Sequence, residues 1–531
     1  MKKLLLCVLL LAACLRFYKL DSYPVSLSWD EAAIGYNAFS IAKTGQDEYG
    51  EKFPLLFQSF NDWKLPGYIY VDAVFVKTFG LSEFWVRFPS ALFGTIAVLL
   101  TFLLFRKILD EKVGLAAAFL MAISPWHLQF SRAAFESNAA LTIILLGLTL
   151  LFYGFQRKSF AVLSVPVLTL SLYFYYSPRI FVPLILLFVL ILYKKEISKN
   201  YKYYLLGAAI AVLVAVPIVT KIISPQGLKR VQEVSLFSDV SIIQPYVAAK
   251  SINSNPLSMI FLNRRIPLAF ESLHSYFAHL SPGFLFFGDD PNPRHRTIYH
   301  GNLYLIEIPL LAWGLWILLK QKENKPKWLL IAWLLLAPIP AAFAREFPHG
   351  LRALLMVPAV VTLSGIGLVA ALRLRFAKLV IALVFTLSIV NYLFNYYVIY
   401  PQTNSRAWAY GYKQAIQQSQ SLENSHDKII FSGNYWKPYI FYLFYSAIDP
   451  HFYIREGTQE KVGKYQFGQA AWDGGKNLDA QTLDELKMGK TLVIISQEEW
   501  ASLQSKEKFT NLKTIYDYSG TGEVFKIGQW E

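Results

Sequence analysis

Residues 4–31 read LLLCVLLLAACLRFYKLDSYPVSLSWDE, an apolar segment followed by the acidic pair Asp30-Glu31. The apolar part is close to the length of a membrane-spanning helix. Lys2 and Lys3 precede it, as they would in a signal peptide. Because no small-residue cleavage motif with a polar start follows, we interpret it as an uncleaved first span. The acidic pair then lies where this span meets water, a position that favours a functional role.

The remainder of the chain repeats this apolar pattern. Of the 531 residues, 55% are hydrophobic and the mean hydropathy is positive, which indicates a polytopic membrane protein. An apolar stretch at 66–80 carries Asp72 and Lys77, and we interpret it as a helix along the membrane interface. We predict eleven α-helical spans, at roughly 4–20, 84–105, 113–126, 136–155, 160–176, 180–193, 203–222, 302–319, 328–344, 353–372 and 379–397.

The charges of the loops predict the orientation of these spans. With the N-terminus inside, the inner segments hold 18 Lys and Arg residues against four acidic ones, as the positive-inside rule requires. The net charge of +15 therefore reflects topology and needs no nucleic-acid partner. The inner segments are Lys2–Lys3, 106–112, 156–158, 194–202, 320–327 and 373–378. The outer ones are 21–83, 127–135, 223–301, 344–352 and the chain after 397.

Two large regions follow from this topology: a membrane module at 1–399 and a C-terminal extracytoplasmic domain at 400–531. Helical patterns at 408–422 and 479–489 and buried-strand patterns at 427–433 and 491–497 predict that the domain is a small α/β fold.

The outer loops also contain helical patterns. The first loop has two amphipathic runs, 30–45 and 64–80, each ended by a glycine, and the loop at 223–301 has one near 256–280. Cys7 and Cys14 are the only cysteines, and their spacing on one helix excludes a disulfide between them. An exterior without cysteine favours a bacterial or archaeal envelope, and we expect the bacterial plasma membrane.

Asp30 and Glu31 have two compatible interpretations. Ser28 and Glu31 have the spacing of a capping box, and acids in a first helical turn suit the helix dipole. A helix start would also hold the Asp30 carboxylate at the membrane surface, where it could accept a proton from an attacking hydroxyl.

Basic side chains gather near the outer span ends, against the inside-positive bias. Each one alone is typical of a snorkelling anchor, whereas together they suit a lipid-linked phosphate. Glu136 follows Arg132 by four residues, so a helix-surface ion pair is the alternative for these two. The cations and histidines are Lys64, Arg87, Arg132, Arg179, Arg264, Arg265, Arg294, His295, Arg345, His349 and Arg352.

Other chemistries have little support. The sequence contains no Walker motif, zinc-ligand spacing or serine-nucleophile elbow. Asp289-Asp290 in a proline-rich turn is typical of solvated carboxylates rather than a metal site. We therefore expect no cofactor and no metal.

Eight stretches of this sequence resemble the C-type membrane glycosyltransferases. Within that group the sequence is similar to the bacterial family 39-like enzymes, which are related to protein O-mannosyltransferases and to the aminoarabinose transferase of lipid A. The stretches are 29–55, 61–70, 80–94, 124–139, 173–183, 288–309, 348–358 and 437–450. The resemblance implies inverting transfer of a hexosyl or pentosyl group from a polyprenyl-phosphate donor on the outer face, without an obligatory metal.

The resemblance also implies roles for single residues. Asp30 matches the acidic residue of the first outer loop that acts as the base, and Glu31 is its neighbour. Lys64 matches a lysine that contacts the carrier phosphate. Arg132 and Glu136 match a basic and an acidic residue of the second outer loop, where relatives usually carry Asp.

Arg352 matches a basic residue near a proline-bearing helix, so Lys64, Arg132 and Arg352 are the predicted phosphate contacts. The predicted supporting residues are Arg87, Glu136, Arg179, Asp290, His295 and His349. The acceptor would be a lipid, a glycan or a protein. Two other functions stay open: a polymerase or ligase of lipid-linked glycans, which would depend on Arg345 or Arg352, and a lipid-glycan flippase.

Overall fold

The computed structural model describes residues 1–531 except 61, 253–262, 264, 323 and 469–476. Contacts divide the chain into two compact units, each described by itself. The helical unit comprises Met1–Tyr18, Leu55–Gly67 and Ser90–Leu393. The sheet unit comprises Lys19–Pro54, Tyr68–Pro89 and Phe394–Glu531. The two units are discontinuous in the chain, because much of the loop after α1 groups with the C-terminal region, and the predicted division into 1–399 and 400–531 stays a prediction.

Every predicted span falls on a helix of the structure. By length and hydropathy alone, five described helices are able to cross a membrane, and a bent pair, α5 with α6 (Pro125–Ser131), adds a sixth. The eleven helices are α1 (Lys2–Phe17), α4 (Glu83–Ile108), α5 (Glu111–Ile123), α7 (Glu136–Gly154), α8 (Lys158–Leu170), α9 (Pro178–Lys199), α10 (Tyr201–Ile222), α15 (Glu307–Lys320), α16 (Lys325–Leu336), α18 (Val357–Ala371) and α19 (Ala377–Phe394). The number of spans stays a prediction.

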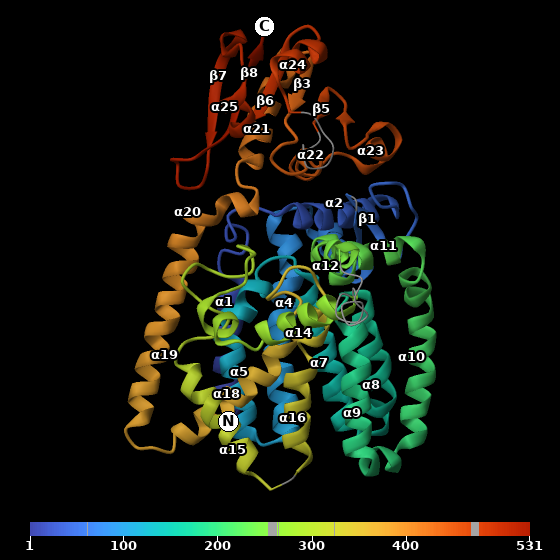
Figure 1. The fold of residues 1–531 in the computed structure, drawn as a ribbon, viewed down its shortest axis with the longest axis vertical. Helices are drawn as coiled ribbons and strands as arrows, with labels where there is room; N and C mark the ends of the chain where they lie inside the picture. The colour runs from blue at the N-terminus through green and yellow to red at the C-terminus, as the bar shows by residue number, and fades with distance from the viewer. Residues whose placement is uncertain (61, 253–262, 264, 323, 469–476) are drawn as a thin grey trace. The chain divides into compact units, whose positions relative to one another are not determined.

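Close packing within the helical unit depends on small residues. Gly314 of α15 faces the backbone of Leu363, and Gly367 of α18 faces the backbone of Leu310, so a Cβ on either glycine would overlap a carbonyl. Small residues let membrane helices approach in this way. Helix α10 also packs against α8 (Figure 1).

Shorter elements of the helical unit occupy the predicted outer loops. They are α11 (Pro225–Val234), α12 (Val240–Ile252), α14 (Arg265–Ala278) and a hairpin of β1 (Phe57–Ser59) with β2 (Asp62–Lys64). The short helix α17 (Ile339–Ala342) lies at the end of the span predicted at 328–344. Helix α14 accounts for the end of the helix predicted near 256–280, and most of the preceding part lies outside the described residues. Neither the hairpin nor α11 was predicted, since neither has a long periodic pattern.

The sheet unit contains both helices predicted in the first outer loop. Helix α2 (Trp29–Thr44) ends at Gly45, whose φ of 71° is left-handed, and α3 (Pro66–Phe79) ends at Gly80 with a φ of 90°. Glycine adopts these angles without the steric cost that a Cβ imposes. The other helices are α20 (Tyr400–Asn404), α21 (Tyr412–Leu422), α22 (Pro438–Tyr445), α23 (Pro450–Glu456), α24 (Ala480–Leu486) and α25 (Gln497–Ser502).

A mixed six-stranded sheet, in the order β4-β5-β3-β6-β8-β7, forms the centre of the sheet unit (Figure 1). Strand β3 pairs in parallel with β5 and β6, and the other pairs are antiparallel. All six residues of β6 are buried, as expected for a strand covered on both faces. The strands are β3 (Lys428–Phe431), β4 (Lys461–Val462), β5 (Tyr465–Phe467), β6 (Thr491–Ser496), β7 (Phe509–Tyr516) and β8 (Glu523–Trp530).

The sequence patterns located four of these elements, α21, β3, α24 and β6, and the predicted small α/β fold at the C-terminus is confirmed. Its core is aromatic: the ring of Tyr412 stacks on that of Phe441 at 4.2 Å and lies beside Phe431 and Phe525. Helix α2 packs against α22 and α23 within this unit.

Candidate active site

The start of α2 positions the acidic pair. The Ser28 hydroxyl accepts from the amide of Glu31 at 3.3 Å, and the Glu31 carboxylate accepts from the amide of Ser28 at 3.0 Å. This reciprocal arrangement is a complete capping box, so that interpretation of Ser28 and Glu31 holds. The neighbouring Trp29 stacks on Trp436 with ring centroids 4.2 Å apart.

A buried ion pair fixes the same turn. Arg87 Nε donates to Glu31 Oε1 at 2.9 Å, and the side chains are 0% and 3% exposed. The remaining nitrogens of Arg87 donate to the carbonyls of Leu20, Pro24 and Ser26. Arg87 therefore neutralises Glu31 and also satisfies the backbone that leads into α2. A charge buried in this way needs both compensations.

Asp30 is the second residue of α2 and is half buried, beside this fixed turn. The helix dipole at that position favours an ionised carboxylate. The structure thus distinguishes two acids that the sequence presents as one pair. Glu31 is engaged in the cap and the ion pair, whereas Asp30 is the acid that remains partly accessible.

A second acid of the first loop lies deeper in the sheet unit. Glu48 is 3% exposed, and its backbone and carboxylate bond to the Asn37 side chain. Burial raises the pKa of Tyr36 and Tyr453, and the Glu48 carboxylate raises both further. Residues 45–54 have the polar composition that is typical of a turn. No sequence signal marked its acids as buried, because local periodicity does not reveal which distant aromatic residues cover a loop.

Arg132, a predicted phosphate contact, lies in the helical unit and is 2% exposed. Its Nη1 donates to the carbonyls of Leu15 and Arg16 at 2.7 and 3.0 Å, and its Nη2 donates to that of Tyr18 at 2.8 Å. The guanidinium therefore satisfies the carbonyls at the C-terminal end of α1, where the helix dipole favours a cation. Its predicted partner Glu136 starts α7 and is half buried.

Arg16 bonds in the same way to the carbonyls that end α5. It was not among the site residues predicted from the sequence. This fully buried side chain donates to the carbonyls of Met121 and Ala122 at the end of α5, and its Nη2 lies 2.7 Å from His127 Nδ1. A charged residue at the end of an apolar span was the available signal.

Three histidines, His279, His295 and His349, form a cluster with Asp290. Three of these four residues were predicted as supporting residues. His295 Nδ1 lies 3.0 Å from Asp290 Oδ2, and the His295 and His349 rings are 4.4 Å apart. The amide of His349 donates to His279 Nε2 at 3.0 Å, and that of Gly350 donates to Asp290. Asp290 is therefore a structural hydrogen-bond acceptor.

The pKa values in this cluster follow from burial and charge. Burial lowers the pKa of His279 to about 4. It lowers the pKa of His349 well below the ordinary value, and neighbouring His295 and Arg352 add to the effect. Burial would raise the pKa of Asp290, but the facing His295 ring and the amides of Gly350 and Asn292 together outweigh it, so this pKa lies below its ordinary value. His279 and His349 are thus neutral at pH 7.

This cluster holds the turn that presents Arg352. Trp126 donates to the Gly350 carbonyl at 2.9 Å, and Ser177 donates to the Arg352 carbonyl at 3.1 Å. The half-buried Arg352 side chain extends from this fixed backbone and donates to the carbonyl of Glu346. The backbone of Arg352 is therefore held on several sides.

The other predicted residues do not join a single cluster. Lys64 ends β2 and is half buried, and Arg179, in the first turn of α9, lies over the Tyr176 ring at 4.2 Å. The Arg345 guanidinium donates to the carbonyls of Ser235 and Ser238. Arg265 begins α14, the Arg294 carbonyl accepts from Gln129, and Arg264 lies outside the described residues. Across the described part of the chain, no three His, Cys, Asp or Glu side chains are arranged to hold a metal ion.

Comparisons with known proteins address the fold. Residues 64–220 match the family model described as dolichyl-phosphate-mannose-protein mannosyltransferase. ArnT from Cupriavidus metallidurans bound to undecaprenyl phosphate is similar, with a TM-score of 0.56 and 10% identity over 99% of this chain and 97% of ArnT. No curated protein matches the sequence.

Two structures from Archaeoglobus fulgidus are also similar. The oligosaccharyltransferase tethered with an acceptor peptide gives a TM-score of 0.54 and 14% identity, over 99% of this chain and 73% of that one. The oligosaccharyltransferase AglB in complex with an inhibitory peptide and a dolichol-phosphate gives 0.51 and 14%, over 99% and 74%. The expected resemblance is confirmed at the level of the fold: this chain has the fold of these membrane glycosyltransferases, and residues 64–220 match the mannosyltransferase family model.

Proposed function

We propose that this protein transfers a sugar from a polyprenyl-phosphate donor to an acceptor hydroxyl at the outer face of the bacterial plasma membrane. The observation that carries the proposal is the half-buried Asp30 at the start of α2, beside the buried Glu31–Arg87 pair. Similar structures bound to undecaprenyl phosphate and to a dolichol-phosphate support a donor of this class.

In the proposed reaction, Asp30 accepts the proton of the acceptor hydroxyl as its oxygen attacks the anomeric carbon. The bond between that carbon and the phosphate oxygen breaks, and polyprenyl phosphate leaves with the bonding electrons. Attack opposite the leaving group inverts the anomeric configuration. General-base assistance of this kind contributes about 10²–10⁴ in rate.

Lys64 and Arg352 are the proposed contacts of the departing phosphate, because cations stabilise the negative charge that develops there. A sugar phosphodiester already has a reasonable leaving group, so we propose that these side chains suffice without a divalent ion. Arg132 and Arg87 instead act as positioning residues, since their guanidinium groups are bonded to the carbonyls that end α1 and precede α2.

The test is incubation of the purified protein with a panel of polyprenyl-phosphate hexoses and pentoses and with candidate lipid, glycan and peptide acceptors. The readout is the release of free polyprenyl phosphate. We expect release with at least one donor and near-complete loss in Asp30→Asn, which keeps the side-chain size. Turnover by Asp30→Asn at the wild-type rate would refute the base assignment.

The panel also distinguishes the other functions. Loss of activity on Arg345 or Arg352 substitution, with Asp30→Asn fully active, would indicate a polymerase or ligase. Movement of the intact donor across vesicle membranes without sugar transfer would indicate a flippase.

A further inference from the structure

A large apolar groove lies within the helical unit, between α1, α5, the end of α18 and α19. Its volume is about 840 Å³, within the range of small-molecule sites. The wall is mostly apolar and includes Leu4, Val8, Leu115, Phe119 and Phe385. None of these residues belongs to the proposed catalytic site.

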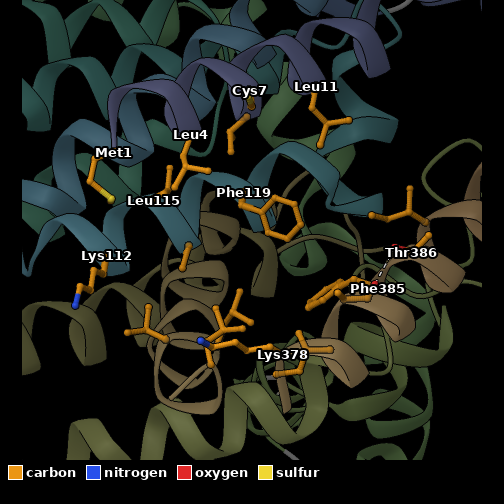
Figure 2. A pocket seen from close by; sticks show the side chains of 18 of the residues that line it. Met1, Leu4, Cys7, Leu11, Lys112, Leu115, Phe119, Lys378, Phe385 and Thr386 are labelled. Carbon is orange, nitrogen blue, oxygen red and sulfur yellow. Dashed lines mark hydrogen bonds between the residues drawn. The ribbon is translucent and has the colours of Figure 1, made fainter. Parts of the chain in front are cut away.

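Positive charge is concentrated at one end of this groove. Lys112 is the second residue of α5, Lys378 is the second residue of α19, and Arg373 follows the end of α18. The amino terminus at Met1, where α1 begins, is also part of the wall. Figure 2 shows Met1 and Lys112 at one end, with Leu11 and Thr386 at the other. Three helices therefore start at the end where the cations gather.

These cations are available to a ligand. Lys112, Arg373 and Lys378 are exposed. In the part of the chain that the structure describes, none of the three side chains forms a salt bridge with a carboxylate. An apolar channel with unpaired cations at its mouth complements an amphiphile with an anionic headgroup. A soluble anion would leave the apolar wall unused.

We propose that the groove binds an anionic phospholipid of the cytoplasmic leaflet. One acyl chain lies along α1, α5 and α19, and the phosphate lies among Lys112, Arg373 and Lys378. The positive-inside rule assigns the loops that carry these cations to the cytoplasmic side. Basic pockets between membrane helices on that side are suited to anionic lipid headgroups. The site is distinct from the donor site, which the proposed reaction requires at the outer face.

The first test compares two probes that differ only in headgroup. Native mass spectrometry of the full chain in detergent would be titrated with dioleoyl-phosphatidylglycerol and with dioleoyl-phosphatidylcholine. We expect one phosphatidylglycerol to bind at least tenfold more tightly. Equal binding of the two lipids would overturn the proposal.

Matched variants locate the site. Each cation near a membrane surface contributes about 1 kcal/mol, or roughly fivefold, so K112Q/R373Q/K378Q should weaken phosphatidylglycerol binding about a hundredfold. The control K194Q/K195Q/K199Q removes three exposed cations at the end of α9, outside the groove, and should bind as the wild type does. The same loss in both variants would assign the effect to net charge.

The acyl-chain part of the site has its own pair of variants. Ala382 lines the groove, and the adjacent Leu383 does not. Ala382→Trp should fill the channel and lower binding of both lipids, whereas Leu383→Trp should not. Binding unaffected by Ala382→Trp would place the lipid elsewhere.

Modification of the two native cysteines reports on lipid binding in a chain whose groove cations are unchanged. Cys7 lines the groove, Cys14 does not, and both are exposed. In a Cys14→Ser chain, phosphatidylglycerol should slow maleimide modification of Cys7. In a Cys7→Ser chain, it should leave modification of Cys14 unchanged. Protection of both cysteines alike, or tighter binding of undecaprenyl phosphate at Cys7, would overturn the phospholipid assignment.

Discussion

Arg87 Nε donates to Glu31 Oε1 at 2.9 Å, and both side chains are withdrawn from solvent. The two residues lie 56 positions apart and join the start of α2 to the start of α4. Because Glu31 is the immediate neighbour of Asp30, this pair sets the position of the proposed base.

Glu31→Gln should lower the free energy of unfolding by about 3–5 kcal/mol, because it leaves the Arg87 charge buried without its partner. Thermal unfolding in detergent measures this. The double variant E31Q/R87M should be less destabilised than the sum of the two single variants. Additive losses would show that the two side chains are not energetically coupled.

Asp30→Asn should reduce sugar transfer by about 10²–10⁴ while the thermal unfolding temperature stays that of the wild type. Asp30 lies outside the Glu31–Arg87 pair and the Ser28–Glu31 capping box, so its replacement by Asn should leave both of these intact. The contrast with Glu31→Gln separates chemistry from positioning. A large drop in unfolding temperature in Asp30→Asn would argue for a structural role instead.

Arg132→Gln should destabilise the chain by about 1–3 kcal/mol, because carbonyls at the end of α1 lose their charged donor. Arg132→Lys should recover only part of this loss, because an ammonium cannot reproduce the guanidinium fork. Kinetics provides the control: the KM for the lipid donor should change little in folded Arg132→Lys. A KM raised tenfold without loss of stability would indicate that Arg132 contacts the donor phosphate.

Stability should decrease as the pH falls from about 6.5 toward 4. An unfolded histidine gains a proton near pH 6.5, whereas the buried His279 has a pKa of about 4, so the unfolded state binds more protons between these values. Between pH 7.5 and pH 5, His279 alone should account for about 2 kcal/mol. Thermal unfolding at pH 7.5 and pH 5 measures the effect.

His279→Asn should reduce this pH dependence, and the same change at the exposed His274 of α14 should not. Equal pH dependence in both variants would exclude His279 as the source.

Local sequence patterns predicted the long helices and four elements of the C-terminal region. Helical periodicity located a helix at each of the eleven spans, and terminal glycines located the ends of α2 and α3. The capping box at Ser28 could be predicted because its two partners are three residues apart. Each of these features depends on residues that are close in the chain, so a local sequence pattern reveals it.

The pattern could not show which distant groups meet. Nothing local indicates that Glu31 pairs with Arg87, or that Arg132 bonds to the carbonyls that end α1. Likewise, the polar sequence around Glu48 suggests a solvated acid. The structure shows it buried near Tyr439 and Tyr453 of the C-terminal region, which the local pattern cannot indicate. Strands β4 and β5 are too short for an alternating pattern to be recognised.

The sheet unit joins the first outer loop to the last part of the chain, which affects biosynthesis. Tyr36 of α2 bonds to the carbonyl of Ile448, 412 residues later. At 5–20 residues per second, a ribosome needs roughly 20–80 seconds to make the intervening chain. During that interval α2 lacks the partners that cover it. Nascent chains should therefore need a chaperone at this stage, and chains stopped before α22 should be degraded faster than the full chain.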